Sequence, residues 1–135
     1  MAFNPQVFKK VLERKLVAPG QVVFREGERA NAAYIILRGA VQISNRNSAG
    51  QQVFLRELVE GEMFGELALM TPDSTRTATV ESKEGCELVV VSPDKLRERL
   101  EAADPILRYW ITSLSERVLD LSKRVRAQGP APKKD

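Results

Sequence analysis

Residues 64–80 begin with Phe64-Gly65-Glu66-Leu67-Ala68-Leu69 and end with Arg76-Thr77-Ala78-Thr79-Val80. The run after Gly65 predicts one helical turn, whose unpaired backbone N–H groups would point at whatever lies in front of it. Arg76 opens a predicted strand, so this turn and the guanidinium can converge on one phosphate. Glu66 would repel that phosphate, and we expect its carboxylate to accept a hydrogen bond from a sugar hydroxyl. A simple turn followed by a surface arginine is the alternative interpretation of these residues.

Short runs rich in β-branched and aromatic residues surround this segment. They are separated at short intervals by turn signals that contain glycine, including Arg38-Gly39, which favours an antiparallel roll over a doubly wound α/β sheet. We therefore predict an α+β fold with a jelly-roll-like antiparallel β-roll at about 16–91. The predicted strands are residues 22–24, 33–37, 41–43, 53–55, 77–80 and 88–91.

Helical patterns flank the predicted roll. At the N-terminus, apolar residues at helical spacing after Asn4-Pro5 predict a short helix that ends near Lys15. After the roll, Ser92 is a predicted N-cap with Pro93 at the first helical position, followed by a short helix at 95–100. Asp104-Pro105 then begins a long helix that runs to about Gln128. We predict one domain at 1–128, with its C-terminal helices at 93–128, and a disordered tail at 129–135.

The long helix carries an apolar stripe whose members are alternately four and three residues apart, the spacing of a coiled coil. Such a stripe needs a partner surface. Pairing with the same helix of a second copy would give a homodimer, and packing against the chain's own roll is the alternative. The stripe consists of Leu107, Ile111, Leu114, Val118, Leu121 and Val125.

Composition excludes several classes of protein. With 135 residues, 43% of them apolar and 29% charged, the chain has the composition of one globular domain. The absence of histidine and the single Cys86 exclude Ser-His and Cys-His catalysis, and no metal site is expected. We expect Cys86 to be a buried hydrophobe. No signal peptide or membrane-spanning run is evident, so we expect a cytoplasmic protein.

Residues 64–69 and 76–80 closely resemble the phosphate-binding cassette of cyclic nucleotide-binding domains. This family includes catabolite-activator regulators, kinase regulatory subunits and cyclic nucleotide-gated channels. The resemblance continues upstream through 19–20, 24–27 and 34–41 and covers roughly 16–128. It implies a sensor, not an enzyme, that binds cAMP or cGMP and signals through its C-terminal helices.

The resemblance also assigns roles to individual residues. It implies that Glu66, assisted by the backbone around Gly65, binds the ribose 2′-hydroxyl and that Arg76 pairs with the cyclic phosphate. Backbone N–H groups of three further residues would complete the site, and one of these residues can add a hydroxyl contact. The ligand-binding set is Phe64, Gly65, Glu66, Leu67, Ala68, Arg76 and Thr77.

The residues that contact the base are less clearly indicated. Alternation would place Phe54, Arg56 and Leu58 on one face of their strand, so Arg56 either faces the base or is solvated. Leu121 and Ser122 lie where catabolite activators present polar residues to the base. The loop at 70–75 is one residue longer than in kinase and channel domains, as in bacterial regulators. We rank cAMP first and cGMP a close second.

The sequence gives less support to three other functions. Only residues 129–135 follow the long helix, so we expect no DNA-binding domain in this chain, although it could be a fragment of a larger regulator. A domain of the same fold that serves as a docking or dimerisation module without nucleotide is the main alternative. Phosphodiester hydrolysis with Glu66 as general base would lack a metal cluster and a second carboxylate. The sequence identifies no protein target.

Overall fold

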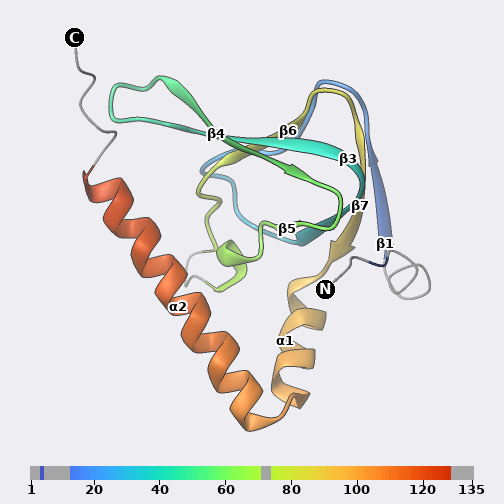
Figure 1. The fold of residues 1–135 in the computed structure, drawn as a ribbon, viewed down its shortest axis with the longest axis vertical. Helices are drawn as coiled ribbons and strands as arrows, with labels where there is room; N and C mark the ends of the chain where they lie inside the picture. Colours follow the sequence, from blue (N-terminus) through green and yellow to red (C-terminus); the bar gives the residue numbers. More distant parts are fainter. Residues whose placement is uncertain (1–3, 5–12, 71–73, 129–135) are drawn as a thin grey trace.

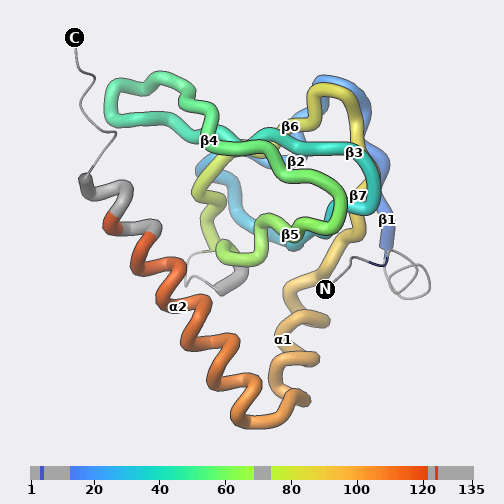
Figure 2. The backbone as a smooth tube through the Cα atoms, in the orientation of Figure 1, coloured from blue at the N-terminus to red at the C-terminus, as the bar shows by residue number. Residues whose placement is uncertain are grey.

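The computed structural model describes Asn4, residues 13–70 and residues 74–128. In these residues a β-roll is followed by two helices that project from it (Figure 1; Figure 2 follows the same path as a tube). The elements are β1 (Glu13–Val17), β2 (Gln21–Phe24), β3 (Ala33–Arg46), β4 (Gln52–Val59), β5 (Met63–Phe64), the 3-10 helix η2 (Leu67–Met70), β6 (Thr79–Ser82), β7 (Cys86–Val91), α1 (Pro93–Ala102) and α2 (Pro105–Gln128).

The strands form an antiparallel sheet in the order β1-β7-β3-β6-β2, and β4 and β5 also pair with β3. The first half of β3 pairs with β7 and β5, whereas its second half pairs with β6 and β4. This long strand therefore belongs to both sides of the roll. The predicted α+β class, an antiparallel roll with C-terminal helices, is confirmed.

The predicted turn at Arg38-Gly39 is wrong, because β3 runs through it without interruption. Gly39 has a φ of 87° and lies next to an irregularity in the pairing with β7. A Cβ atom on Gly39 would lie 2.5 Å from the Gly85 carbonyl oxygen. Glycine here lets the strand bend against β7, a function that the sequence pattern could not distinguish from a turn.

The predicted end of the N-terminal helix near Lys15 is also wrong. Lys15 lies in β1, which pairs with β7 from Glu13↔Val90 to Val17↔Cys86. This pairing joins residues far apart in the sequence, so local spacing did not indicate it. The rest of the predicted helix and the tail at 129–135 lie outside the described residues.

Two apolar clusters hold the roll together. The larger one fills its interior and includes Phe24, Tyr34, Phe64 and the fully buried Ile36. The smaller one lies on the other face of β3 and β7, where Leu96 of α1 packs against it. Cys86 is buried in the larger cluster, as expected.

The two C-terminal helices begin as predicted. The Ser92 hydroxyl accepts a hydrogen bond from the Lys95 N–H at 3.2 Å, and Pro93 occupies the first turn. At the start of α2, the Asp104 carboxylate accepts from the Ile106 N–H at 2.8 Å. From there α2 runs past η2 and away from α1 (Figure 1). Neither helix, over the described residues, has the length and apolar character needed to cross a bilayer.

Candidate functional site

A cavity of about 750 Å³ lies inside the roll, between the β3–β4 hairpin and the segment that follows β5. It contains both residues that the sequence singled out for ligand chemistry, Glu66 and Arg76, together with apolar side chains and backbone. Its lining consists of Phe24, Ile43, Asn45, Leu55, Arg56, Leu58, Glu62, Met63, Phe64, Gly65, Glu66, Leu67, Ala68, Arg76, Thr77, Ala78 and Val80. All seven predicted ligand-binding residues are in this lining.

The turn after β5 depends on Gly65. Its φ of 81° is a conformation that L-residues with side chains rarely adopt. A Cβ atom at this position would lie 2.7 Å from Nη1 of Arg76. Gly65 thus gives the chain its direction into η2 and leaves room for the guanidinium. The predicted helical turn after Gly65 is present as the 3-10 helix η2.

The backbone of Arg76 is fixed by the turn between β2 and β3. The Arg76 N–H donates to the Glu28 carbonyl at 2.8 Å, and the Gly27 N–H donates to the Arg76 carbonyl at 2.9 Å. These bonds hold residue 76 beside a segment almost fifty positions earlier in the chain. Arg76 and Thr77 precede β6, which begins at Thr79, so the predicted strand start at Thr77 is wrong.

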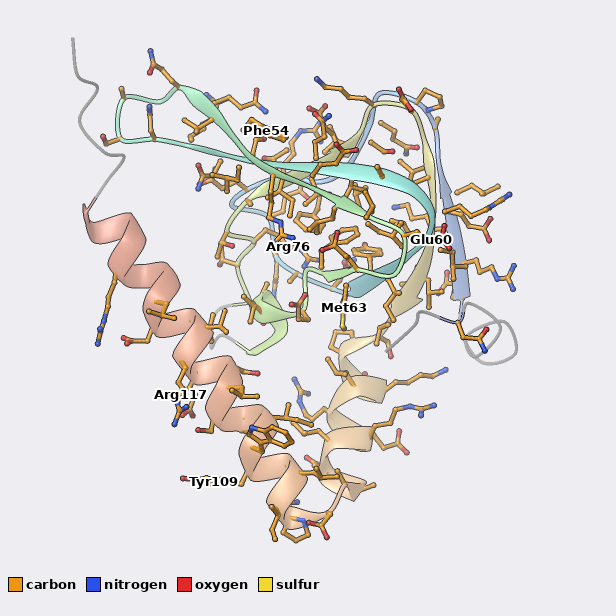
Figure 3. All side chains as sticks on the ribbon, viewed as in Figure 1. Phe54, Glu60, Met63, Arg76, Tyr109 and Arg117 are labelled. Carbon is orange, nitrogen blue, oxygen red and sulfur yellow. The ribbon has the colours of Figure 1, made fainter. Side chains whose placement is uncertain are left out.

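The Arg76 side chain is buried, with 2% of its surface exposed. Its guanidinium donates to the Gly65 carbonyl at 2.8 Å and to the Ala32 carbonyl at 2.5 Å. Both acceptors are neutral, and among the described residues no ion pair joins Arg76 to a carboxylate. Figure 3 shows Arg76 within the roll, in contrast to Tyr109 and Arg117 on α2. Burial lowers the pKa of Arg76, and neighbouring acidic groups oppose this effect.

Glu66 is half-buried in the same cavity. Burial raises the pKa of its carboxyl group, while its own backbone N–H and the charge of Arg76 act in the opposite direction. The net rise shows that desolvation is the largest effect. The cavity therefore combines a buried cation with a carboxylate that gains from a new hydrogen-bond donor.

Arg56 lies on the cavity side of β4, where it forms an ion pair with Glu62 at 3.0 Å. Glu62 also accepts a hydrogen bond from the Val59 N–H at 2.8 Å. The predicted grouping of Phe54 with Arg56 on one face is wrong, because a register irregularity between Ile43 and Ser44 leaves Leu55 as an extra residue. Arg56 and Phe54 consequently face opposite sides.

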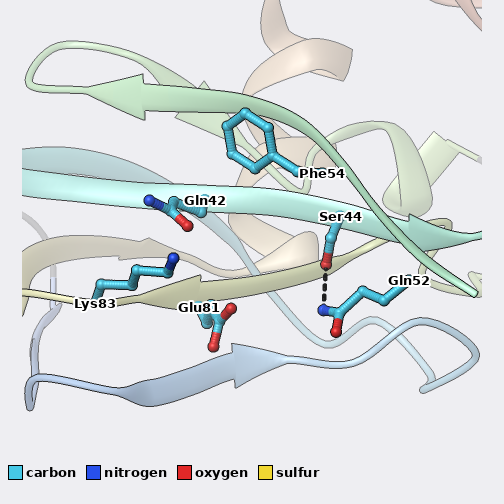
Figure 4. A pocket seen from close by; sticks show the side chains of 6 residues that line it. All are labelled: Gln42, Ser44, Gln52, Phe54, Glu81 and Lys83. Carbon is cyan, nitrogen blue, oxygen red and sulfur yellow. Dashed lines mark hydrogen bonds between the residues drawn. The ribbon is translucent and has the colours of Figure 1, made fainter.

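Phe54 lines a separate cleft of about 450 Å³ on the outer face of the roll (Figure 4). Its other lining residues are polar, and the Gln52 side chain donates to the Ser44 hydroxyl at 2.9 Å. Glu81 and Lys83, of opposite charge, lie side by side in the cleft, so it carries no concentrated charge for an ionic ligand. The inner cavity is the better candidate for a binding site.

The helix α2 contributes no described residue to the lining of the cavity. Leu121 is 58% exposed, and the side chain of Ser122 lies outside the described set. Their predicted contacts with the base stay predictions. No group of acidic or cysteine side chains in the described part of the chain could hold a metal ion.

A family model described as the cyclic nucleotide-binding domain matches residues 14–103, from β1 to the end of α1, and so includes the whole cavity lining. The chain belongs to the cyclic nucleotide-binding domain family. The resemblance inferred from residues 64–80 is confirmed.

Similar proteins agree with this membership. The cAMP-activated global transcriptional regulator CRP of Haemophilus influenzae is 32% identical over 99 residues, covering 73% of this chain and 44% of the relative. The chain thus spans less than half the length of that regulator.

Several solved structures are similar to this chain. The EAL enzyme Bd1971 in its cAMP-bound form has a TM-score of 0.68 and 31% identity, covering 78% of this chain and 28% of the enzyme. Its cGMP-bound form has a TM-score of 0.71 and 29% identity, covering 83% and 30%. The Thermus thermophilus catabolite activator protein has a TM-score of 0.65 and 25% identity, covering 87% and 51%. A cyclic nucleotide-binding domain of CRP type is therefore established here.

Sequence reasoning missed the groups that hold Arg76 and Arg56. Phe24 was predicted only as the end of a strand, and Ala32 was not singled out at all, although Phe24 and the Ala32 carbonyl both contact the guanidinium. No sequence signal marks a backbone carbonyl as an acceptor. The signal that could have indicated Glu62 is its opposite charge to Arg56, six residues earlier, with the turn at Gly61 between them.

Proposed function

We propose that the protein is a cyclic nucleotide sensor that binds cAMP, and cGMP as the second choice, without enzymatic activity. The observation that carries the proposal is the buried guanidinium of Arg76 at the cavity, which has neutral acceptors but no described carboxylate partner. An unpaired buried charge is costly, and an anion that enters the cavity would offset this cost. A cyclic phosphate carries one negative charge and suits a single arginine.

In this proposal the cyclic phosphate pairs with Arg76, and the backbone N–H groups of Leu67, Ala68 and Thr77 complete its surroundings. Glu66 accepts a hydrogen bond from the ribose 2′-hydroxyl. The proximity of Glu66 to Arg76 in one cavity supports this division, because the sugar hydroxyl and the cyclic phosphate are adjacent on the same ring. Gly65 allows the close approach of backbone to ligand.

The base would extend toward Leu55 and Arg56. The name of the Haemophilus influenzae relative supports cAMP, and the Bd1971 structures contain either cAMP or cGMP. Arg56 and Glu62 together offer donors and an acceptor, which either purine edge can use. This is why we propose cAMP first and keep cGMP second.

Signalling would pass through α2. Five residues of its apolar stripe are between 44% and 58% exposed, namely Leu107, Ile111, Leu114, Val118 and Leu121. We propose that this stripe pairs with its counterpart in a homodimer and that the ligand changes how the helices pair. The ligand can shift α2 only by the difference in its affinity for the two arrangements.

Calorimetric titration with cAMP, cGMP and 5′-AMP tests the proposal. Micromolar or tighter binding of a cyclic nucleotide, with much weaker binding of 5′-AMP, is the expected result. A thermal shift with the same ligands provides an independent readout. If no ligand gives heat or a shift, the proposal is wrong and a docking module that works without nucleotide becomes the better interpretation.

A further inference from the structure

Three buried aromatic side chains from different strands pack together beneath the cavity. Phe24 ends β2, Tyr34 lies in β3 and Phe64 ends β5. Their ring centroids are 6.2 Å apart for Phe24 and Tyr34, 6.0 Å for Phe24 and Phe64, and 5.3 Å for Tyr34 and Phe64. Each ring is therefore held by the other two, and the cluster is a rigid floor.

The guanidinium of Arg76 lies on this floor. Its central carbon is 3.9 Å from the centroid of the Phe24 ring and 6.0 Å from that of Tyr34. The shorter distance is that of a cation stacked on an aromatic face, where the ring's negative quadrupole attracts the charge. Phe24 is thus the closer of the two rings, and it covers one face of the guanidinium.

The edge of the guanidinium is fixed as well. Nη1 donates to the Gly65 carbonyl and Nη2 donates to the Ala32 carbonyl. A Cβ atom on Gly65 would lie 2.7 Å from Nη1 and 3.4 Å from Cε2 of Phe24. A guanidinium has five N–H donors, so after these two bonds it still has donors for a ligand. Stacking and hydrogen bonding together leave the side chain little rotational freedom.

We propose that Phe24 is a positioning residue that holds the Arg76 guanidinium in its anion-binding orientation before any ligand arrives. That the anion is a cyclic phosphate rests on the proposed function, whereas the orientation of Arg76 does not. A side chain that is already fixed loses less conformational entropy when the ligand binds. Phe24 itself acts only through Arg76.

A double-mutant cycle tests this role. Phe24→Leu removes the aromatic face but keeps an apolar side chain, and it should weaken binding of the cyclic nucleotide about fivefold to tenfold in the wild-type background. In an Arg76→Ala background the same change should have no effect on affinity. Phe24→Tyr keeps the ring and should restore affinity to within about threefold of wild type. Equal losses for Phe24→Leu in both backgrounds would overturn the proposal.

Val41→Ala is the matched control. Val41 is fully buried in the same apolar cluster, but it does not line the cavity. It should lower the unfolding temperature at least as much as Phe24→Leu, while affinity for the cyclic nucleotide stays unchanged. If Val41→Ala weakens binding as much as Phe24→Leu does, the effect is general loosening of the roll and the positioning role is refuted.

A measurement without ligand separates this inference from the proposed function. In ¹⁵N-labelled free protein, the Arg76 side-chain N–H signals, assigned by their loss in Arg76→Lys, should be shifted upfield by the Phe24 ring current. Phe24→Leu should remove this shift. An upfield shift in a protein that binds no cyclic nucleotide would support the positioning role and refute the proposed ligand. If the protein binds a cyclic nucleotide but shows no upfield shift, the proposed ligand is supported and the positioning role of Phe24 is refuted.

Discussion

The segment between β5 and β6 and the helix α2 were both singled out from the sequence, but the described residues cover them to very different extents. Arg76 is 2% exposed and is bonded to Gly65 and Ala32, whereas Leu114 on α2 is 44% exposed. Figure 1 shows the corresponding contrast in shape, with a curled sheet that surrounds its interior and a long helix that passes outside it. The groups around Arg76 are thus already in place in the folded chain, whereas the described residues leave the stripe on α2 exposed.

The largest expected effect is on the ligand site. Arg76→Ala should weaken binding of the cyclic nucleotide about tenfold to a hundredfold, because a hydrogen bond to a charged group contributes about 1.5–3 kcal/mol. Calorimetry measures the change, and Arg117→Ala on the exposed surface of α2 is the control. Wild-type affinity in Arg76→Ala would show that the buried cation is not the anchor.

The other half of the comparison is tested by placing a charge in the stripe. Leu114→Asp should raise the dimer dissociation constant about fivefold to a hundredfold, because a buried polar group without a partner costs about 1–3 kcal/mol. Sedimentation equilibrium measures the constant, with Glu116→Ala, an exposed position outside the stripe, as the control. A wild-type protein that stays monomeric at all concentrations would remove the homodimer from the proposal.

The proposed contact between Glu66 and the ribose hydroxyl is the next part of the ligand site to test. Glu66→Ala should weaken binding of cAMP about twofold to tenfold, the contribution of one hydrogen bond of about 0.5–1.5 kcal/mol. Binding of 2′-deoxy-cAMP, which lacks the hydroxyl, should change much less. Parallel titrations compare the two ligands, and equal losses for both would contradict the contact with the ribose.

The burial of Glu66 should also make the stability of the ligand-free protein depend on pH. Burial raises the pKa of this carboxyl above its ordinary 4.5, so the folded protein holds the proton more tightly than the unfolded chain. The free energy of unfolding should therefore decrease as the pH rises from 4.5 through the raised pKa. Glu66→Gln removes this dependence. Compared with the wild type, the variant should therefore gain stability as the pH rises from acid to neutral. Thermal unfolding at several pH values measures this difference. If the unfolding temperatures of the wild type and of Glu66→Gln change equally with pH, the raised pKa of Glu66 is contradicted.

The smallest expected effect belongs to a contact outside both regions. The Glu87 carboxylate lies 3.4 Å from Nη1 of Arg14 and 2.5 Å from Nη2 of Arg38, so it joins β7 to both neighbouring strands. Both arginines are well exposed, and Glu87→Gln should lower the unfolding free energy by about 1 kcal/mol or less. Urea unfolding measures this loss. A change in nucleotide affinity would mean that the roll and the ligand site are more tightly coupled than their separation suggests.

Local sequence features predicted most of the roll and the cavity. Residues 64–68 line the cavity and the predicted helical turn after Gly65 is present, because glycine and helix-forming residues favour particular local backbone conformations. Arg76 lines the same cavity. The capping of α1 by Ser92 likewise depends on neighbouring residues alone. Such features need no knowledge of distant contacts.

Features that depend on distant contacts were missed. Local spacing did not show that Lys15 pairs with Leu88 in β7, or that Gly39 bends a strand instead of ending it. The extra residue Leu55 separated Phe54 from Arg56, since strict alternation assumes a regular ladder. The stacking of Phe24 on Arg76 joins β2 to the segment before β6 and was equally invisible.

The pairing of β1 with β7 has a consequence for synthesis of the protein. Glu13 of β1 pairs with Val90 of β7. During synthesis, β1 therefore cannot pair until β7, the last strand of the roll, has left the ribosome. Until then the residues of β1 have no partner strand, and such unpaired segments are sites for wrong pairing between nascent chains. Contacts this distant in sequence also slow folding. We therefore expect the roll to form late and as a unit, with α1 packing against it only afterwards.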